Sequence, residues 1–119
     1  MSKITLGLPM YGRGWTGVAD GGKKGLFQAA SGPAPGTWAA GNEDYKVLHT
    51  RFPNANHDTA AIAAWGFDGT TFWSFDDAWT FQKKAEYIKT KQLRGAMMWE
   101  LDGDDSSGTL IAAIAGALK

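Results

Sequence analysis

The chain has 119 residues, and its acidic and basic side chains balance to a formal net charge of zero. This length predicts one domain with a modest core, and the charge balance does not favour a nucleic acid or an anionic membrane as partner. The absence of cysteine excludes disulfides and thiolate metal sites, and no apolar run approaches the length of a membrane span. Six tryptophans and sixteen glycines are many for this length and suggest loops that present aromatic rings.

The first predicted element is a strand over Lys3–Tyr11, which is apolar enough to be buried on both faces. Pro9 suits such a strand only near its end, where backbone pairing stops. Gly12, Gly14 and Gly17 are expected to end the strand and start a loop. No signal peptide precedes this strand, so we expect the chain to be cut from a longer protein.

The middle of the chain is rich in turn signals. Residues 19–36 are dominated by glycine, proline and serine, and residues 43–52 have apolar side chains at the spacing of a brief helix. Ala63–Phe67 and Thr71–Phe75 flank Asp68–Thr70, whose Asp-Gly pair is typical of a hairpin turn. A β-hairpin is therefore the strongest local prediction in this region.

Two helices and a strand are predicted in the last third. The Asp76–Asp77 pair caps a helix that reaches about Leu93, and lysines in its later turns suit the helix dipole. A second buried strand covers Ala96–Leu101, and the Ser106–Ser107 pair is predicted to cap a final helix. The side chains expected to face the core are Phe81, Ala85 and Ile88 in the first helix and Leu110, Ile111, Ile114 and Leu118 in the second.

The order of these elements predicts an α+β fold with two parts. Residues 1–13 and 76–119 read as two parallel strand–helix units joined by a right-handed crossover. Residues 14–75 are too many for an ordinary loop and contain their own hairpin. They are expected to form a small α+β subdomain at the carboxyl end of the first strand.

Five segments of the chain carry a recognisable pattern in a fixed order: Leu8–Val18, Gly32–Trp38, Glu43–Leu48, Trp73–Asp77 and Gly95–Leu101. Together they resemble the C-terminal part of a bacterial glycoside hydrolase family 18 chitinase. The resemblance implies that the chain is part of a (β/α)8 barrel, with its seventh and eighth strands, and that residues 14–75 are the family's chitinase insertion domain, which forms one wall of a deep cleft. The implied reaction of the parent enzyme is hydrolysis of β-1,4-linked N-acetylglucosamine polymers outside the cell.

The resemblance also implies residues that bind substrate. Trp99 would form the floor of the subsite for the reacting sugar, Tyr11 and Arg13 would lie near the base of the cleft, and Tyr45 and Lys46 would lie where the insertion faces the substrate. The alternative for Trp99 is a core position, and for Tyr11 and Arg13 a role in capping the strand. Most tryptophans of residues 14–75 are expected in the core, with one or two exposed as platforms on which a sugar ring can stack. The four tryptophans of this region are Trp15, Trp38, Trp65 and Trp73.

The family's catalytic motif, Asp-x-x-Asp-x-Asp-x-Glu, does not occur in these 119 residues, nor does the Tyr-Asp pair expected on strand six. We therefore expect no catalytic residue, no cofactor and no hydrolytic activity in this chain alone. Glu100 is expected to point away from Trp99 by strand alternation. The acidic run Asp102–Asp105 lacks the pattern of a calcium loop, and helix capping accounts for it without a metal. His49 and His57 are expected at the surface.

Three hypotheses follow for the chain by itself. It is the substrate-binding portion of a chitinase, with chitin or chitooligosaccharide as ligand; or it is a non-catalytic sugar-binding module in its own right; or it is an inert structural fragment. Two parallel strands cannot bury both faces of their sheet, and their edges stay unpaired. A homo-oligomer or a domain-swapped dimer is therefore expected.

Overall fold

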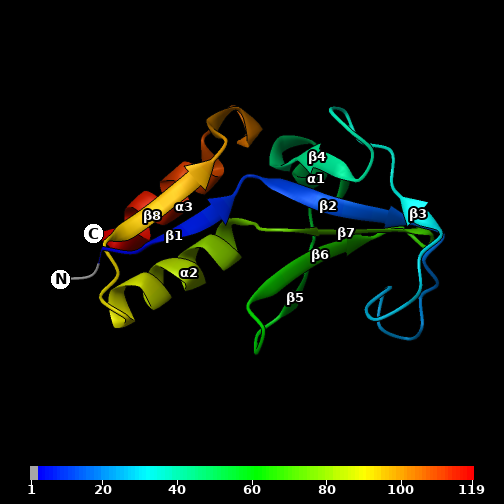
Figure 1. Cartoon of the computed structure of the whole chain (residues 1–119), viewed down its shortest axis with the longest axis horizontal. Coiled ribbons are helices and arrows are strands. Elements are labelled where there is room, and N and C mark those ends of the chain that lie inside the picture. The colour runs from blue at the N-terminus through cyan, green and yellow to red at the C-terminus, as the bar shows by residue number, and fades with distance from the viewer. Residues whose placement is uncertain (1–2) are drawn as a thin grey trace.

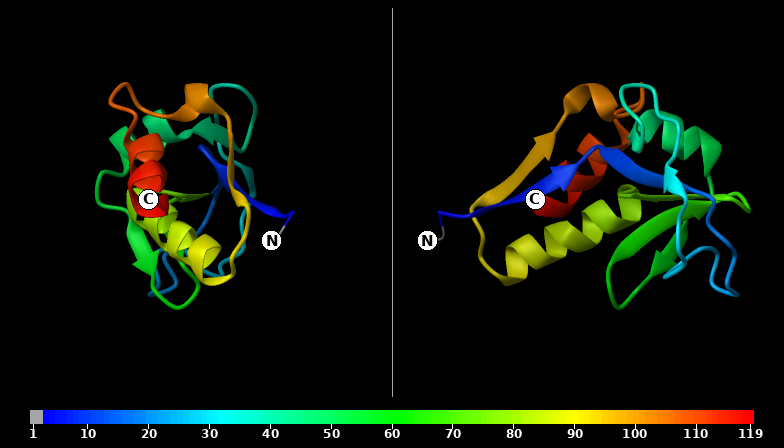
Figure 2. Two further views of the ribbon diagram at one scale, coloured as in Figure 1. Left: turned by 90° about the vertical axis from the view of Figure 1, so that its left-hand side faces the viewer. Right: turned by 45° about the vertical axis from the view of Figure 1, so that its right-hand side comes forward.

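The computed structural model describes residues 3–119, whose elements form two adjoining parts (Figure 1). In the first part, β1 (Thr5–Pro9) and β8 (Gly95–Trp99) pair in parallel, from Thr5 opposite Gly95 to Pro9 opposite Trp99. The helices α2 (Ala78–Thr90) and α3 (Thr109–Leu118) lie together beside this two-stranded sheet (Figure 2). The predicted pair of parallel strands and the α+β class are confirmed.

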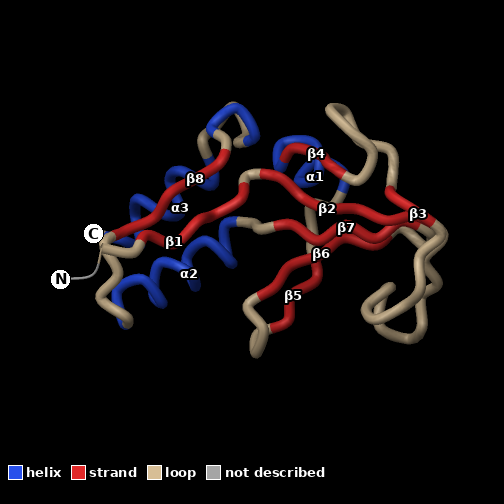
Figure 3. The backbone as a smooth tube through the Cα atoms, viewed as in Figure 1, coloured by secondary structure: helices blue, strands red, loops and turns tan. Residues whose placement is uncertain are grey.

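The second part is a six-stranded antiparallel sheet in the order β3-β2-β7-β6-β5, with β4 also pairing with β2. The short helix α1 (Tyr45–Arg51) belongs to this part, and Figure 3 shows how loops connect its strands. The brief helix and the hairpin predicted from the sequence are both present. The strands are β2 (Tyr11–Thr16), β3 (Gly32–Pro33), β4 (Asn42–Asp44), β5 (Asn56–Asp58), β6 (Ala63–Phe67) and β7 (Thr71–Phe75).

The boundary between the two sheets lies at Met10. Residues 11–13 are predicted from the sequence to belong with the barrel strands, as part of 1–13, but they begin β2 of the second sheet. Residues 1 and 2 of that predicted range lie outside the described residues. Only Met10 separates the end of β1 at Pro9 from the start of β2 at Tyr11, so the first strand leads directly into the second (Figure 1).

The prediction of a loop at Gly12 and Gly14 is wrong, because both glycines lie inside β2. A Cβ on Gly12 would lie 2.4 Å from Cδ1 of Leu48, and one on Gly14 would lie 2.3 Å from the ring of Trp73. These glycines allow bulky side chains to pack directly on the strand backbone. Gly17, with a φ of +67°, does leave the strand as expected.

The helix predicted after Asp77 begins at Ala78. The Asp77 carboxylate accepts from the Thr80 N–H at 3.0 Å, and the Thr80 hydroxyl accepts from the Asp77 N–H at 2.8 Å, which is a complete capping box. Phe81, Ala85 and Ile88 are all buried, as their helical spacing predicted.

The predicted serine cap of the last helix is wrong. Gly108 occupies the N-cap position, and buried Asp104 accepts from the N–H groups of Leu110 and Ile111 at 3.0 Å. Asp105 accepts from the Thr109 N–H at 3.1 Å. Carboxylates satisfy a helix N-terminus better than a neutral hydroxyl because the helix dipole favours negative charge there. The acidic run therefore serves as a cap.

One hydrophobic core extends through both parts. Met10 is fully buried at their junction; its N–H donates to the Trp99 carbonyl at 2.8 Å, and its carbonyl accepts from the Tyr45 N–H at 3.0 Å. None of the helices in residues 3–119 has the length and apolarity that a membrane crossing needs. The most buried members of the core are Leu8, Met10, Ala34, Tyr45, Leu48, Trp73, Phe81, Ala85 and Leu110.

Replacing Gly14 by alanine should destabilise the fold by about 1–3 kcal/mol, because the new methyl group would overlap the Trp73 ring. Urea denaturation followed by tryptophan fluorescence measures this loss. Gly32→Ala is the matched control, since a Cβ at Gly32 meets nothing within 4 Å. Equal unfolding midpoints for the two variants would contradict this packing.

Hydrogen bonds from the side chain of Thr109 and from nearby backbone N–H groups lower the pKa of Asp105. A carboxylate whose pKa is lowered by folding stabilises the native state above its unfolded pKa, and that stability is lost as pH falls through the folded value. Asp105→Asn should therefore cost about 0.5–1 kcal/mol at pH 7, and this difference should shrink as pH falls below the ordinary aspartate pKa of about 3.9 and through the lower folded value. Thermal unfolding across pH measures it, with Glu86→Gln as control for a lost exposed charge. A pH-independent difference would contradict it.

Candidate functional site

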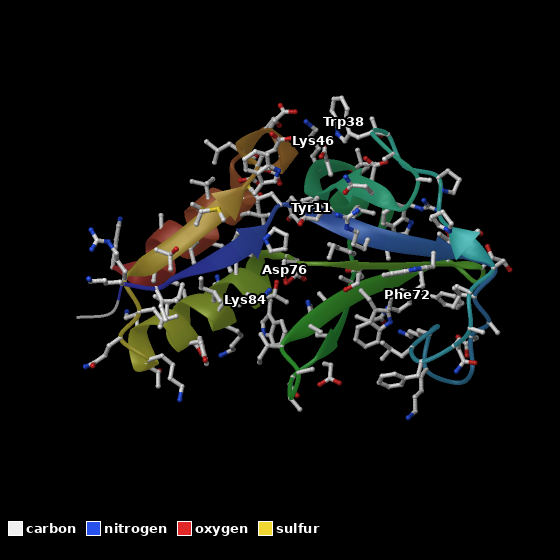
Figure 4. The ribbon with its side chains drawn as sticks, viewed as in Figure 1. Tyr11, Trp38, Lys46, Phe72, Asp76 and Lys84 are labelled. Carbon is white, nitrogen blue, oxygen red and sulfur yellow. The ribbon has the colours of Figure 1, made fainter. Side chains whose placement is uncertain are left out.

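A groove of about 380 Å³ opens where the two parts of the molecule meet. Figure 4 shows Tyr11 at this junction, with Trp38 above it on the second part. Elements from both sheets form the walls, so the groove exists only when the two sheets are held together. Its lining residues are Met10, Tyr11, Arg13, Trp38, Asn42, Asp44, Trp99 and Glu100.

Trp99 is the last residue of β8, and its side chain is 63% exposed. The carboxyl ends of parallel strands meet at one edge of a sheet, which is where barrels of this kind carry their sites. The parallel register places Trp99 opposite Pro9, directly before the junction. The alternative of a buried core tryptophan is therefore excluded.

Tyr11 and Arg13 lie two residues apart on β2, so their side chains share one face of the strand. The Arg13 guanidinium lies 5.3 Å from the Tyr11 ring centroid, within range of a cation–π contact. Within residues 3–119, Arg13 forms no ion pair. The described residues therefore do not include an acidic partner with which Arg13 would cap the strand. Tyr11, Arg13 and Trp99 all line the same groove.

Tyr45, predicted to face the substrate, lies in the core instead. Its side chain is 1% exposed, and its ring stacks on His49 with 5.3 Å between centroids. Burial and, to a smaller extent, the nearby carboxylates of Asp105 and Asp77 together raise the pKa of its hydroxyl to about 12. Tyr45 is the first residue of α1, and the side of the helix on which it lies packs inward.

Lys46, also predicted to face the substrate, connects the two parts of the molecule. Its Nζ donates to the Asp102 carbonyl at 2.6 Å and to the Asp102 carboxylate at 3.2 Å, and it lies 3.6 Å from the Asp44 carboxylate. The hydrogen bond with Asp102 raises the pKa of Lys46. Asp102 belongs to the short 3-10 helix Leu101–Gly103 that follows β8. Lys46 therefore supports the groove from outside its lining.

Four groove residues were missed by sequence reasoning: Met10, Asn42, Asp44 and Glu100. β4 pairs with β2 so that Asp44 lies opposite Tyr11 and Asn42 opposite Arg13, a long-range register that no local pattern indicates. The expectation for Glu100 is wrong, because β8 ends at Trp99 and strand alternation no longer applies beyond it. Trp38 and Asp44 lie in two of the segments that carry the family resemblance, Gly32–Trp38 and Glu43–Leu48. That membership is the one feature of the sequence that could have indicated a role for Asp44 in the groove.

The tryptophans of residues 14–75 divide equally between core and surface: two exposed rings were predicted, but the core holds only two of the four and not most of them. Trp65 and Trp73 are buried, whereas Trp15 and Trp38 are exposed. Trp38 is held by its ring N–H, which donates to the Asp44 carboxylate at 3.0 Å. Two exposed rings, Trp38 and Trp99, therefore border the groove, each with polar neighbours.

The groove is suited to binding a polar ligand that has flat apolar faces. Aromatic rings supply the stacking surface, and Arg13, Asn42 and Glu100 supply hydrogen-bonding groups at the rim. Buried Asp44 is already engaged by Trp38 and lies close to Lys46. Within residues 3–119 no cluster of three or more metal-binding side chains occurs.

Comparison with known proteins gives a consistent match. The model of the family described as "Glycosyl hydrolases family 18" matches residues 1–104. Chitinase 63 of Streptomyces plicatus is 42% identical over 117 residues, which cover 98% of this chain and 18% of that protein. Chitinase A1 of Niallia circulans is 40% identical over 110 residues, which cover 87% of this chain and 16% of that protein.

The fold matches as well. The catalytic domain of psychrophilic chitinase B from Arthrobacter TAD20 superposes with a TM-score of 0.88 at 40% identity, covering 98% of this chain and 26% of that domain's chain. The chain thus spans less than a fifth of the length of the two chitinases aligned by sequence. Its two parallel strand–helix units and the inserted sheet correspond to a portion of a larger fold. With the match over residues 1–104, this likeness establishes that the chain belongs to glycosyl hydrolase family 18.

Proposed function

We propose that this chain is the substrate-binding portion of a chitinase and that it binds chitooligosaccharide in the groove between its two parts, without hydrolysing it. The proposal rests on one observation: the exposed Trp99 ring lines the same groove as Tyr11 and Arg13. A sugar stacked on such a ring removes two apolar faces from water, while its hydroxyls bond at the rim.

The polar lining supports a neutral sugar as ligand. Asn42 lines the groove, and its Oδ1 is a buried acceptor that has no hydrogen-bond partner among the described residues, whereas buried acceptors are normally paired. The hydroxyl and acetamido groups of a chitooligosaccharide can donate such hydrogen bonds. Arg13 and Glu100 bring opposite charges to the same groove, which gives no preference for a charged ligand.

Other family members bind ligands of this class. The class V chitinase from Nicotiana tobaccum has been solved in complex with NAG4, and a group IV chitinase of Ostrinia furnacalis in complex with allosamidin. Family membership, together with the groove geometry, extends the ligand class to this chain. Affinity on the order of millimolar is expected, because the chain presents only a small part of the length of its relatives.

The proposed lack of hydrolysis rests on the chain's chemistry. No Asp-x-Asp-x-Glu motif is present in the 119 residues. The two carboxylates that line the groove are Asp44, which is buried and already hydrogen-bonded, and the exposed Glu100. Neither has the motif's companion acid, which the resemblance implies is needed to position the substrate's acetamido group.

An inert, self-associating fragment is the second candidate. It is favoured by the open face of the two-stranded sheet, where the exposed side chains of Met97 and Trp99 share one face of β8. Apolar side chains gathered on one face are typical of an interaction surface. This candidate predicts oligomers without saturable sugar binding, whereas the proposed function requires saturable binding.

Removing the Trp99 ring should abolish most of the sugar affinity. Trp99→Ala is expected to weaken chitooligosaccharide binding at least about tenfold, since the stacking surface is lost. The exposed position of Trp99 should leave the fold intact. Calorimetric titration measures the change. Tyr87→Ala removes an exposed ring from α2, outside the groove, and should leave affinity unchanged. Equal binding by both variants would refute the groove as the site.

Incubation of the purified chain with chitooligosaccharides should release no shorter sugars beyond the uncatalysed background. Mass spectrometry of the products measures this directly. Glu100→Gln and Asp44→Asn serve as controls, because any genuine turnover at the groove would depend on one of these carboxylates. Turnover by the unmodified chain that disappears in either variant would show the proposal to be wrong.

A further inference from the structure

We propose that two copies of this chain associate through the open edge of β8, in an antiparallel two-fold pairing centred on Met97. The inference concerns assembly and does not rest on the proposed function. Within residues 3–119, β1 is the one strand that pairs with β8, and it lies along one edge only (Figure 3). An unpaired strand edge presents a row of backbone groups that can pair with a strand of another chain.

Backbone alternation identifies the edge of β8, rather than that of β1, as the one able to pair. The Met10 N–H donates to the Trp99 carbonyl at 2.8 Å, so the backbone groups of Trp99 point toward β1. By alternation, those of Ala96 and Met98 point to the open edge of β8. The same alternation places Pro9 at the open edge of β1, where a proline has no N–H to donate. The edge of β1 is thus interrupted, and the edge of β8 is continuous.

The edge of β8 is accessible to a second strand. Met97 is 52% exposed and Trp99 is 63% exposed. The strand runs Gly-Ala-Met-Met-Trp, without the charged residues or prolines that commonly block an edge. A Cβ built on Gly95 would meet nothing within 4 Å, so the start of the strand is open as well. Neither charge nor proline within β8 therefore opposes pairing along it.

The charges that flank β8 indicate the partner and the register. Arg94 directly precedes the strand and Glu100 directly follows it, with Met97 midway between them. Both side chains are exposed, and neither forms an ion pair in the described part of the chain. When two β8 strands run antiparallel with Met97 opposite its own copy, Arg94 of each copy lies opposite Glu100 of the other. The edge is complementary in charge to itself, which favours a second copy as its partner.

The same register suits the rest of the strand. Ala96 of one copy lies opposite Met98 of the other, and both turn their backbone groups to the open edge, so each such pair can exchange two hydrogen bonds. Met97 and its copy form a non-hydrogen-bonded pair, in which side chains approach closely. Trp99 lies opposite Gly95, so its ring can cover a position that has no side chain. A shift by one residue would put these backbone groups out of phase.

The pairing also relieves the weakness of a two-stranded sheet. Two strands alone are marginally stable in water, whereas a sheet of three or more strands with an apolar face packed on helices is stable. Residues opposite each other in antiparallel strands point to the same face, so α2 and α3 of both copies would cover one face of the joined sheet. The exposed Met97 side chains of the two copies would then pack against each other on the other face.

Cysteine cross-linking tests the register directly. The chain has no cysteine, so Met97→Cys introduces a single thiol, on the proposed two-fold axis. Cβ atoms of a non-hydrogen-bonded pair lie about 4.5–5.5 Å apart, close to the spacing that a disulfide bridges. Treatment with oxidised glutathione should convert most of this variant to a covalent dimer. Tyr87→Cys, at a position on α2 that is 51% exposed, is the matched control and should remain mostly monomeric.

Charge reversal tests the partner, with sedimentation equilibrium as the measurement. The unmodified chain should dimerise with a dissociation constant on the order of 0.1 mM, because the interface is small. Arg94→Glu should weaken dimerisation at least about tenfold, since like charges then lie opposite each other. Adding Glu100→Arg to it restores opposite charges and should recover dimerisation to within about threefold. Lys23→Glu reverses an exposed charge on the second part of the molecule and should leave dimerisation unchanged.

Three results would overturn this pairing. One is a chain that stays monomeric at millimolar concentration. Another is an equal yield of covalent dimer from Met97→Cys and Tyr87→Cys, because the register would then be unspecific. The third is a dimer that Arg94→Glu leaves unchanged, which would show that another surface holds the copies together. The readouts are dimerisation and cross-linking rather than sugar binding, so a failure of the proposed function would not affect this test.

Discussion

The arrangement of the whole chain depends on the backbone of Met10. Its N–H bonds to the Trp99 carbonyl of the parallel sheet, and its carbonyl accepts from Tyr45 at the start of α1. The Met10 side chain is fully buried, and Gly103 approaches so closely that a Cβ there would lie 2.3 Å from the Met10 carbonyl oxygen. One residue therefore ties β8, the inserted sheet and the loop after β8 together. If this junction loosened, the groove would lose its shape.

The groove follows from that junction, because its walls come from different sheets. Trp99 comes from β8, Tyr11 and Arg13 from β2, and Asp44 from β4. Lys46 adds a second tie outside the lining through its hydrogen bonds with Asp102. A site built in this way has precise geometry only when both sheets are fixed, which is why residues that touch no ligand still shape it.

The proposed function separates sugar binding from the chemistry of hydrolysis. Stacking on an exposed ring and hydrogen bonding at a polar rim require only a few well-placed side chains. Hydrolysis in this family is implied to require, in addition, a proton donor and an acid that positions the acetamido group, and the sequence contains no such motif. The proposed sugar site accordingly needs only the groove residues present here, and the chemistry would depend on residues that these 119 do not include.

The sequence by itself determined the local elements: the Asp-Gly hairpin, the helix after Asp77 with its buried stripe, and the two apolar strands ending near Pro9 and Trp99. These depend on neighbours along the chain, and local patterns report them. The tertiary structure alone decided the rest. Gly14 lies in a strand because the Trp73 ring packs on it, Tyr45 is buried although its motif suggested a sugar contact, and Asp44 reaches the groove through pairing with Tyr11. Each of these depends on contacts between distant residues, which periodicity and turn signals do not encode.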